Sequence, residues 1–203
     1  MSFSFEKAKV LVLQIKTRDE HMQKSLAYEI DLLSRLVEIK TESVPKKGYD
    51  ECAQIIINEA EQSSLRWEIV DGEKGAKDGL SRPNVIVTLD SGSDTTLLLE
   101  SHFDVVPTGK GWKYPPFKLT VEGDKAYGRG TADNKAGIAA ALGAMRQLSS
   151  KELDFNIKLV AGVVVADSHQ VLAVLSEIPQ HLALAGIELF VIVVEPDDFR
   201  VTT

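Results

Sequence analysis

Hydrophobic residues repeat along the chain with two periods, and each period predicts one kind of element. Between residues 26 and 37 an apolar residue stands at every third or fourth position, which predicts a helix. The same period predicts helices at 50–63 and 134–148. A further helical stretch is predicted at 169–185, with an interruption at Pro179.

Shorter apolar runs between these helices predict strands. They cover residues 65–70, 84–89, 95–99, 155–165 and 187–194. The run at 155–165 is hydrophobic nearly throughout, which is typical of a strand covered on both faces. Strands that alternate with helices favour an α/β fold. We expect a three-layer sandwich in which a mixed, mostly parallel central sheet is covered by helices on both faces.

Polar side chains gather at two points where predicted elements end or begin. The apolar run 96–99 is followed by polar residues that include His102 and Asp104. The polar segment 128–135, which includes Asp133, opens the next helix. In an open α/β sheet, sites collect beyond the carboxyl ends of the strands. We therefore expect these two segments to meet.

Three residues are candidate metal ligands: His102, Asp133 and Glu195, the last of which follows the strand at 187–194. Imidazole and carboxylates suit zinc, and the two oxygens of one carboxylate can bridge two ions. Asp104 lies two residues beyond His102, on the same side of an extended chain, and could orient the imidazole. Each ligand also has a plainer interpretation. His102 could be an exposed polar residue, Asp133 a helix cap and Glu195 an exposed strand end.

Composition and charge narrow the function classes. The net charge of −7 and the pI near 5.2 argue against nucleic acid as a partner and favour a small molecule. We expect no membrane span, since the longest apolar stretch, 187–194, is short and contains Glu188. Charges at Glu6 and Lys7 argue against a secretory segment. The single cysteine, Cys52, is expected in the core and suggests a reducing compartment, so we expect a cytoplasmic protein.

The region from 102 to 137 resembles a known signature. The matching residues are His102-Phe-Asp104-Val-Val-Pro107, Trp112, Pro116-Phe117 and Tyr127-Gly-Arg-Gly130-Thr-Ala-Asp133-Asn-Lys135-Ala-Gly137. In this order they are similar to the co-catalytic zinc aminoacylase and carboxypeptidase family. That family includes acetylornithine deacetylase, succinyl-diaminopimelate desuccinylase and the glutamate-releasing carboxypeptidase. Weaker similarity extends from about residue 28 to 165 and returns at Glu195.

The resemblance implies a metal centre and a reaction. It implies that His102 binds one metal ion, that Asp133 bridges two, and that Glu195 completes the first site. Asp104 is expected to support His102 as part of the catalytic machinery. The implied cofactor is Zn2+ at one or two sites, with Co2+ or Mn2+ as alternatives. The implied reaction is hydrolysis of an amide bond in an N-acyl amino acid or a small peptide.

The chain departs from the family pattern after the strand at 155–165. Where relatives carry two consecutive glutamates, a general base and a metal ligand, this chain has Ala166-Asp167-Ser168-His169. Ser168 then stands at the base position, where a hydroxyl cannot act as a base near neutral pH. Asp167 is an alternative base, although its side chain is shorter by a methylene and displaced by one position. His169 stands at the ligand position and could still bind a cation. We therefore expect an incomplete second metal site and weak or absent catalysis.

Family members are also longer than this chain. They carry an inserted lid or dimerisation domain and a return segment with another histidine ligand, and we find neither in these 203 residues. We expect residues 1–24 to form an N-terminal helical extension and residues 25–203 a partial, apparently truncated catalytic domain. Because the strand at 187–194 would lack its usual cover, we expect a homo-oligomer. The alternative function is a non-catalytic metal-binding or protein-interaction module with the same fold.

Overall fold

A computed structural model describes residues 20–71, 81–163 and 189–193 of the chain. In these ranges the helices are α2 (Glu20–Glu38), α3 (Tyr49–Gln62) and α4 (Lys135–Leu148). The strands are β1 (Arg66–Asp71), β2 (Pro83–Leu89), β3 (Thr96–His102), β4 (Thr120–Glu122), β5 (Lys125–Tyr127), β6 (Asn156–Gly162) and β7 (Leu189–Val193). The three helices and five strands predicted for the described residues are confirmed. Among those residues, no helix combines the length and the apolar character that a bilayer crossing requires.

The central sheet has the strand order β1-β2-β6-β3-β7 in the described part of the chain. Strand β3 is parallel to both β6 and β7, whereas β2 is antiparallel to both β1 and β6. The predicted α/β fold with a mixed sheet is confirmed, although the parallel pairs do not outnumber the antiparallel ones. Helix α4 connects β3 to β6, and a helical crossover of this kind brings two strands into parallel register.

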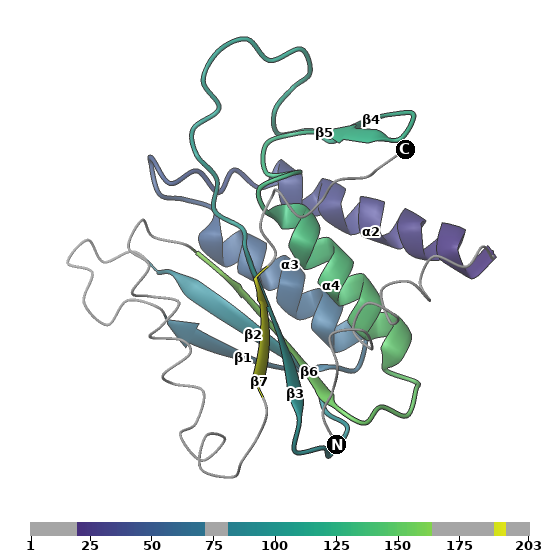
Figure 1. The fold of residues 1–203 in the computed structure, drawn as a ribbon. Coiled ribbons are helices and arrows are strands. Elements are labelled where there is room, and N and C mark those ends of the chain that lie inside the picture. Colours follow the sequence, from purple (N-terminus) through teal and green to yellow (C-terminus); the bar gives the residue numbers. More distant parts are fainter. Residues whose placement is uncertain (1–19, 72–80, 164–188, 194–203) are drawn as a thin grey trace.

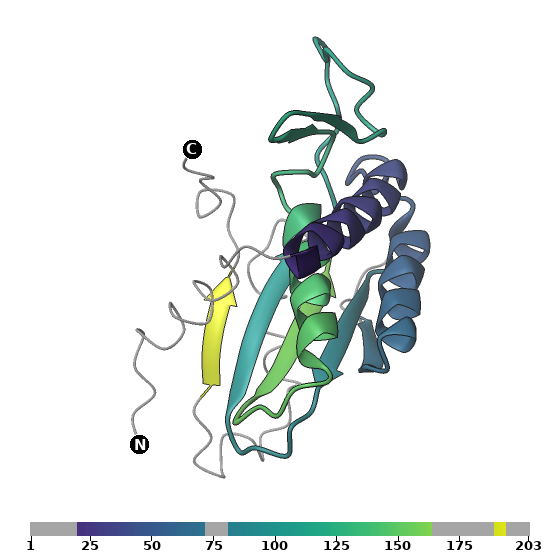
Figure 2. The same ribbon diagram turned by 90° about the vertical axis from the view of Figure 1, so that its right-hand side faces the viewer.

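The described helices all lie on one face of the sheet, as the view in Figure 2 shows. The core between them and the sheet is built from aliphatic side chains of α2, α3 and α4 and includes the fully buried Cys52. On the opposite face Ile86, Leu98 and Val160 form a smaller buried cluster. The helical stretch at 169–185, predicted to cover that face, lies outside the described residues.

Helix α2 packs against α4 and is tied to α3 by the buried carboxylate of Glu59. The Tyr28 hydroxyl donates to Glu59 Oε2 over 2.6 Å, and Arg35 Nη2 donates to Glu59 Oε1 over 2.7 Å. The Arg146 guanidinium of α4 lies 4.4 Å from the centre of the Tyr28 ring. The predicted start of the domain, at residue 25, falls inside α2, and residues 1–19 lie outside the described part of the chain.

Strand β3 extends farther than its apolar run predicts. The sequence places the end of the strand near residue 99, but Glu100, Ser101 and His102 continue the parallel ladder with β6. Backbone hydrogen bonding decides where a strand ends, so polar side chains can follow an apolar run within one strand. His102 is therefore the last residue of β3. The ribbon of β3 leads up toward the start of α4 (Figure 1).

Candidate metal site

Two of the predicted ligands meet at the carboxyl end of β3. The Nε2 atom of His102 lies 2.9 Å from Oδ1 of Asp133. The His102 side chain is 24% exposed, whereas that of Asp133 is 60% exposed. The imidazole is thus mostly buried, whereas the Asp133 carboxylate is mostly exposed to solvent. The two polar segments meet as the sequence predicts.

Asp104 contacts the other nitrogen of the same imidazole. His102 Nδ1 lies 3.1 Å from the backbone oxygen of Asp104 and 3.3 Å from its Oδ1 atom. Asp104 is buried, so its carboxylate lies behind the ring and away from the exposed side of Asp133. A carboxylate in this position fixes the orientation of an imidazole and raises its basicity.

The two carboxylates change the protonation of His102. Burial acts to lower the pKa of His102, but the hydrogen bonds and negative charges of Asp104 and Asp133 outweigh it and raise the pKa to about 9. Near neutral pH the metal-free ring therefore carries a proton on both nitrogens. It donates one hydrogen bond toward each aspartate.

Asp133 does not cap the helix that follows it. The N-cap of α4 is Asn134, and no side chain makes a capping hydrogen bond there. The peptide bond between Asp133 and Asn134 is cis. Because the Asp133 carboxylate contacts His102, its observed partner is the imidazole and not the first turn of α4.

The turn that carries Asp133 is held by two residues to which the sequence pattern gave no role. The buried Ser101 hydroxyl donates to the backbone oxygen of Asn134 over 2.8 Å. The Lys135 side chain is fully buried, and its Nζ atom donates to the backbone oxygens of Leu36 and Ile39 over 2.7 and 2.9 Å. Burial lowers the pKa of Lys135 to about 8. The sequence signal for Lys135 is its inward position on an amphipathic helix, because lysine is seldom fully buried.

Contacts between Arg129 and Trp112 fix part of the chain that follows β3. The guanidinium of Arg129 lies 4.9 Å from the centre of the Trp112 ring, and its Nη2 atom donates to the backbone oxygens of Pro107 and Thr108 over 3.3 and 3.4 Å. The Trp112 indole also donates to the oxygen of Thr108. These contacts link two parts of the signature, the segment that follows β3 and the segment that contains Arg129.

The remaining predicted site residues lie outside the described part of the chain. These are Glu195, His169 and Ser168. Within the described residues, no group of three or more potential ligands gathers around one point. The side chains of His102 and Asp133 are nevertheless suitable ligands for a divalent cation. Asp104 orients the imidazole through Nδ1, and the Asp133 carboxylate is largely exposed. The described residues therefore bring together two candidate metal donors, His102 and Asp133.

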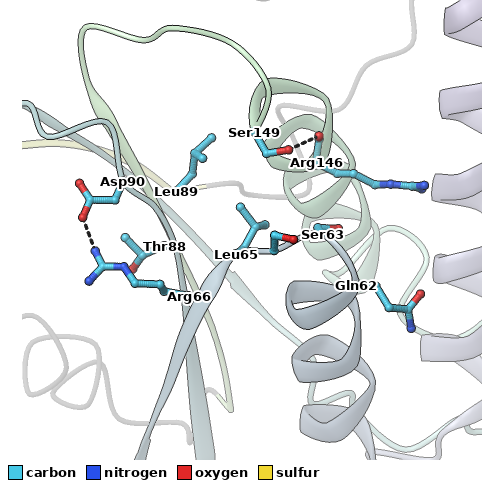
Figure 3. Close-up of a pocket in the computed structure, with 10 residues that line it drawn as sticks. Gln62, Ser63, Leu65, Arg66, Thr88, Leu89, Asp90, Arg146 and Ser149 are labelled. Carbon is cyan, nitrogen blue, oxygen red and sulfur yellow. Dashed lines mark hydrogen bonds and ion pairs between the residues drawn. The ribbon is translucent and has the colours of Figure 1, made fainter.

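A cavity of about 550 Å3 lies at the other end of the sheet, where α3 and α4 end and β1 begins. Figure 3 shows its lining, with Arg66 turned toward Asp90. Arg66 Nη2 lies 2.5 Å from Asp90 Oδ2, and the Arg146 guanidinium stacks on Tyr28. Both arginines already have partners, so the lining offers neither of them as a free anion-binding group. None of the predicted site residues in the described part of the chain, His102, Asp104 and Asp133, lines this cavity.

Known proteins share both the sequence and the fold of this region. The profile of peptidase family M20/M25/M40 matches residues 98–163, a stretch that contains His102, Asp104 and Asp133. A probable succinyl-diaminopimelate desuccinylase from Staphylococcus aureus is 35% identical over 125 residues. The aligned part covers 61% of this chain and 28% of that protein.

Two solved structures resemble the chain. Human carnosine dipeptidase 1 superposes with a TM-score of 0.65 at 21% identity, over 85% of this chain and 40% of that one, which shows the fold. The M20 family metallo-carboxypeptidase Sso-CP2 from Sulfolobus solfataricus superposes with a TM-score of 0.55 at 29% identity, over 71% of this chain and 30% of that one. The chain thus spans well under half the length of the relatives it matches. The resemblance drawn from the signature residues is confirmed, and residues 98–163 match peptidase family M20/M25/M40.

Proposed function

We propose that this chain provides the metal-binding part of a hydrolase that cleaves amide bonds in N-acyl amino acids or small peptides. The observation that carries the proposal is the contact between His102 and Asp133, with Asp104 behind the imidazole. The relatives support the reaction class, because their names describe a desuccinylase, a dipeptidase and a metallo-carboxypeptidase. A small substrate also agrees with the net charge of −7, which disfavours nucleic acid.

Zn2+ is the proposed cofactor, with Co2+ or Mn2+ as alternatives. His102, Asp133 and Glu195 would hold it at the first site, and Asp133 and His169 would contribute to a second. A bound divalent cation would polarise the scissile carbonyl and lower the pKa of a water molecule. Asp104 holds the proton of His102 Nδ1, which leaves Nε2 as the ligand atom once its own proton is lost.

The second candidate function is a non-catalytic metal-binding or protein-interaction module. The observation that favours it is the segment Ala166-Asp167-Ser168-His169, which lacks the glutamate that would act as a general base. Asp104 does not fill that role, because its buried carboxylate faces the imidazole. A cytoplasmic location and a homo-oligomeric state remain proposals under either function.

One experiment separates these functions. The full chain is stripped of metal and titrated with Zn2+, and hydrolysis of N-acetyl and N-succinyl amino acids is then measured. His102→Ala tests the site, and His21→Ala serves as the matched histidine control. Zinc binding and turnover that both depend on His102 support the hydrolase, whereas zinc binding without turnover supports the non-catalytic module. A chain that binds no Zn2+ at submillimolar concentration contradicts both metal functions.

A further inference from the structure

We propose that Lys135 and Ser101 are positioning residues that hold the turn bearing Asp133 so that its carboxylate meets His102. The inference deepens the proposed function and rests on it, because the contact between Asp133 and His102 matters for function only if the two residues bind a divalent cation. Neither residue touches the reacting groups, and both would act through Asp133.

Lys135 connects the turn to the end of α2. Its Nζ atom donates to the backbone oxygens of Leu36 and Ile39, which lie at the carboxyl end of that helix. The last carbonyls of a helix lack partners within the helix and attract a cation. The lysine therefore satisfies them from 99 and 96 residues away in sequence and fixes the start of α4 relative to α2.

Ser101 connects the same turn to the sheet. It precedes His102 on β3, and its hydroxyl donates to the oxygen of Asn134, which follows Asp133. One hydrogen bond thus joins the immediate neighbours of the two proposed ligands. The backbone N–H of Lys135 also donates to the oxygen of Gly130 over 2.9 Å, which closes the turn on itself.

These contacts hold the turn from two sides, by the sheet through Ser101 and by α2 through Lys135. Burying an ammonium group costs free energy, and a well-packed apolar side chain at the same position is often at least as stabilising. Stability alone therefore does not explain a lysine at position 135, whereas its role in positioning Asp133 does. Because its hydrogen bonds end on the backbone at the carboxyl end of α2, at Leu36 and Ile39, Lys135 does not reach a substrate itself.

The first test uses the metal-free full chain. The ¹⁵N chemical shifts of the His102 ring are recorded at one fixed pH for the parent, Lys135→Met, Ser101→Ala and Asp133→Asn. Lys151→Met, which removes an exposed lysine beyond α4, is the matched control. We expect Lys135→Met and Ser101→Ala to move the Nε2 shift toward the value of Asp133→Asn. Parent-like ring shifts in folded Lys135→Met and Ser101→Ala would overturn the inference.

The second test measures Zn2+ affinity by competition with a chromophoric chelator. We expect Lys135→Met to weaken binding about 10- to 100-fold, the usual effect of losing a residue that orients a metal ligand, and Lys151→Met to leave it unchanged. In an Asp133→Asn background the same lysine change should cost little more, because it acts through that carboxylate. An equal loss in both backgrounds would show a merely structural role and overturn the inference.

Two further outcomes are also decisive. If Lys135→Met does not fold, Ser101→Ala keeps the lysine contacts and carries the same two measurements. If the parent chain binds no Zn2+, the proposed function fails, whereas the His102 ring shifts still decide whether Lys135 and Ser101 hold the Asp133 turn.

Discussion

The imidazole of His102 and the carboxylate of Asp133 form a hydrogen-bonded pair of 2.9 Å across 31 residues of sequence. The Nε2 atom must carry a proton for this bond to form, since the carboxylate can only accept. A metal ion that binds the same nitrogen must displace that proton. The metal-free pair is therefore a protonated form of the proposed site.

The first prediction concerns the pH dependence of the metal-free chain. With chelator present, NMR titration of His102 should give a pKa of about 9, above the ordinary value of 6.5. Because the folded-state pKa is raised, the stability that His102 contributes is fully present below about 6.5 and is lost as the pH rises to about 9. Denaturant unfolding at several pH values measures this loss as the difference between the parent and His102→Asn.

The lowered pKa of Lys135 has the opposite effect, since it makes the folded chain more stable as the pH rises above about 8. This effect is present in both the parent and His102→Asn, so it cancels in the difference between them. Asp133→Asn should lower the pKa of His102, because it removes one of the two carboxylates. A His102 pKa near 6.5 in the parent would contradict the arrangement of the pair.

Much of this site could be read from residue types and their spacing. His102 comes just after an apolar run and Asp133 just before an amphipathic helix, and the carboxyl end of a parallel strand is where such residues meet. The extent of β3 could not be predicted, because its last three residues are polar and are held by backbone pairing with β6. Hydrophobic periodicity carries no information on such pairing.

The residues that hold the turn were harder to foresee. The inward position of Lys135 on its helix predicts that the side chain is buried, but its partners are the backbone oxygens of Leu36 and Ile39. Backbone atoms are the same at every position, so no side-chain pattern points to them. The antiparallel pairing of β2 with both of its neighbours could not be predicted either, because the alternation of strands and helices does not show which strands pair.

The second prediction concerns Cys52. Its thiol is fully buried in α3, and burial raises its pKa to about 12 although the charge of Lys135 acts against the shift. A thiol-reactive disulfide reagent should therefore modify the native chain only as fast as it unfolds, and modify the unfolded chain at once. Absorbance of the released thiolate measures both rates. Rapid labelling of the native chain would contradict the burial of Cys52.

The third prediction compares two hydrogen-bonded carboxylates. Tyr28→Phe removes a 2.6 Å bond to the buried Glu59, and we expect a loss of about 1.5 kcal/mol of unfolding free energy because the acceptor is charged. Asp90→Asn weakens the exposed pair with Arg66 and should change stability by less than about 0.5 kcal/mol. Urea unfolding measures both. Equal losses would show that burial does not distinguish these two carboxylates.

The fourth prediction uses two glycines that share a left-handed backbone but differ in their surroundings. Gly130 has a φ of +89° and Gly92 one of +76°, so alanine at either position carries a strain of about 1–2 kcal/mol. A Cβ atom on Gly92 meets nothing within 4 Å, whereas one on Gly130 lies 3.0 Å from side-chain atoms of Lys135 and Val105. Gly130→Ala should therefore destabilise the chain by roughly 1–2 kcal/mol more than Gly92→Ala, the usual cost of overfilling a packed site. It should also weaken Zn2+ binding, because the displaced lysine belongs to the turn that carries Asp133. Equal effects of the two variants on unfolding and on Zn2+ titration would show that the contact between Gly130 and Lys135 does not constrain the site.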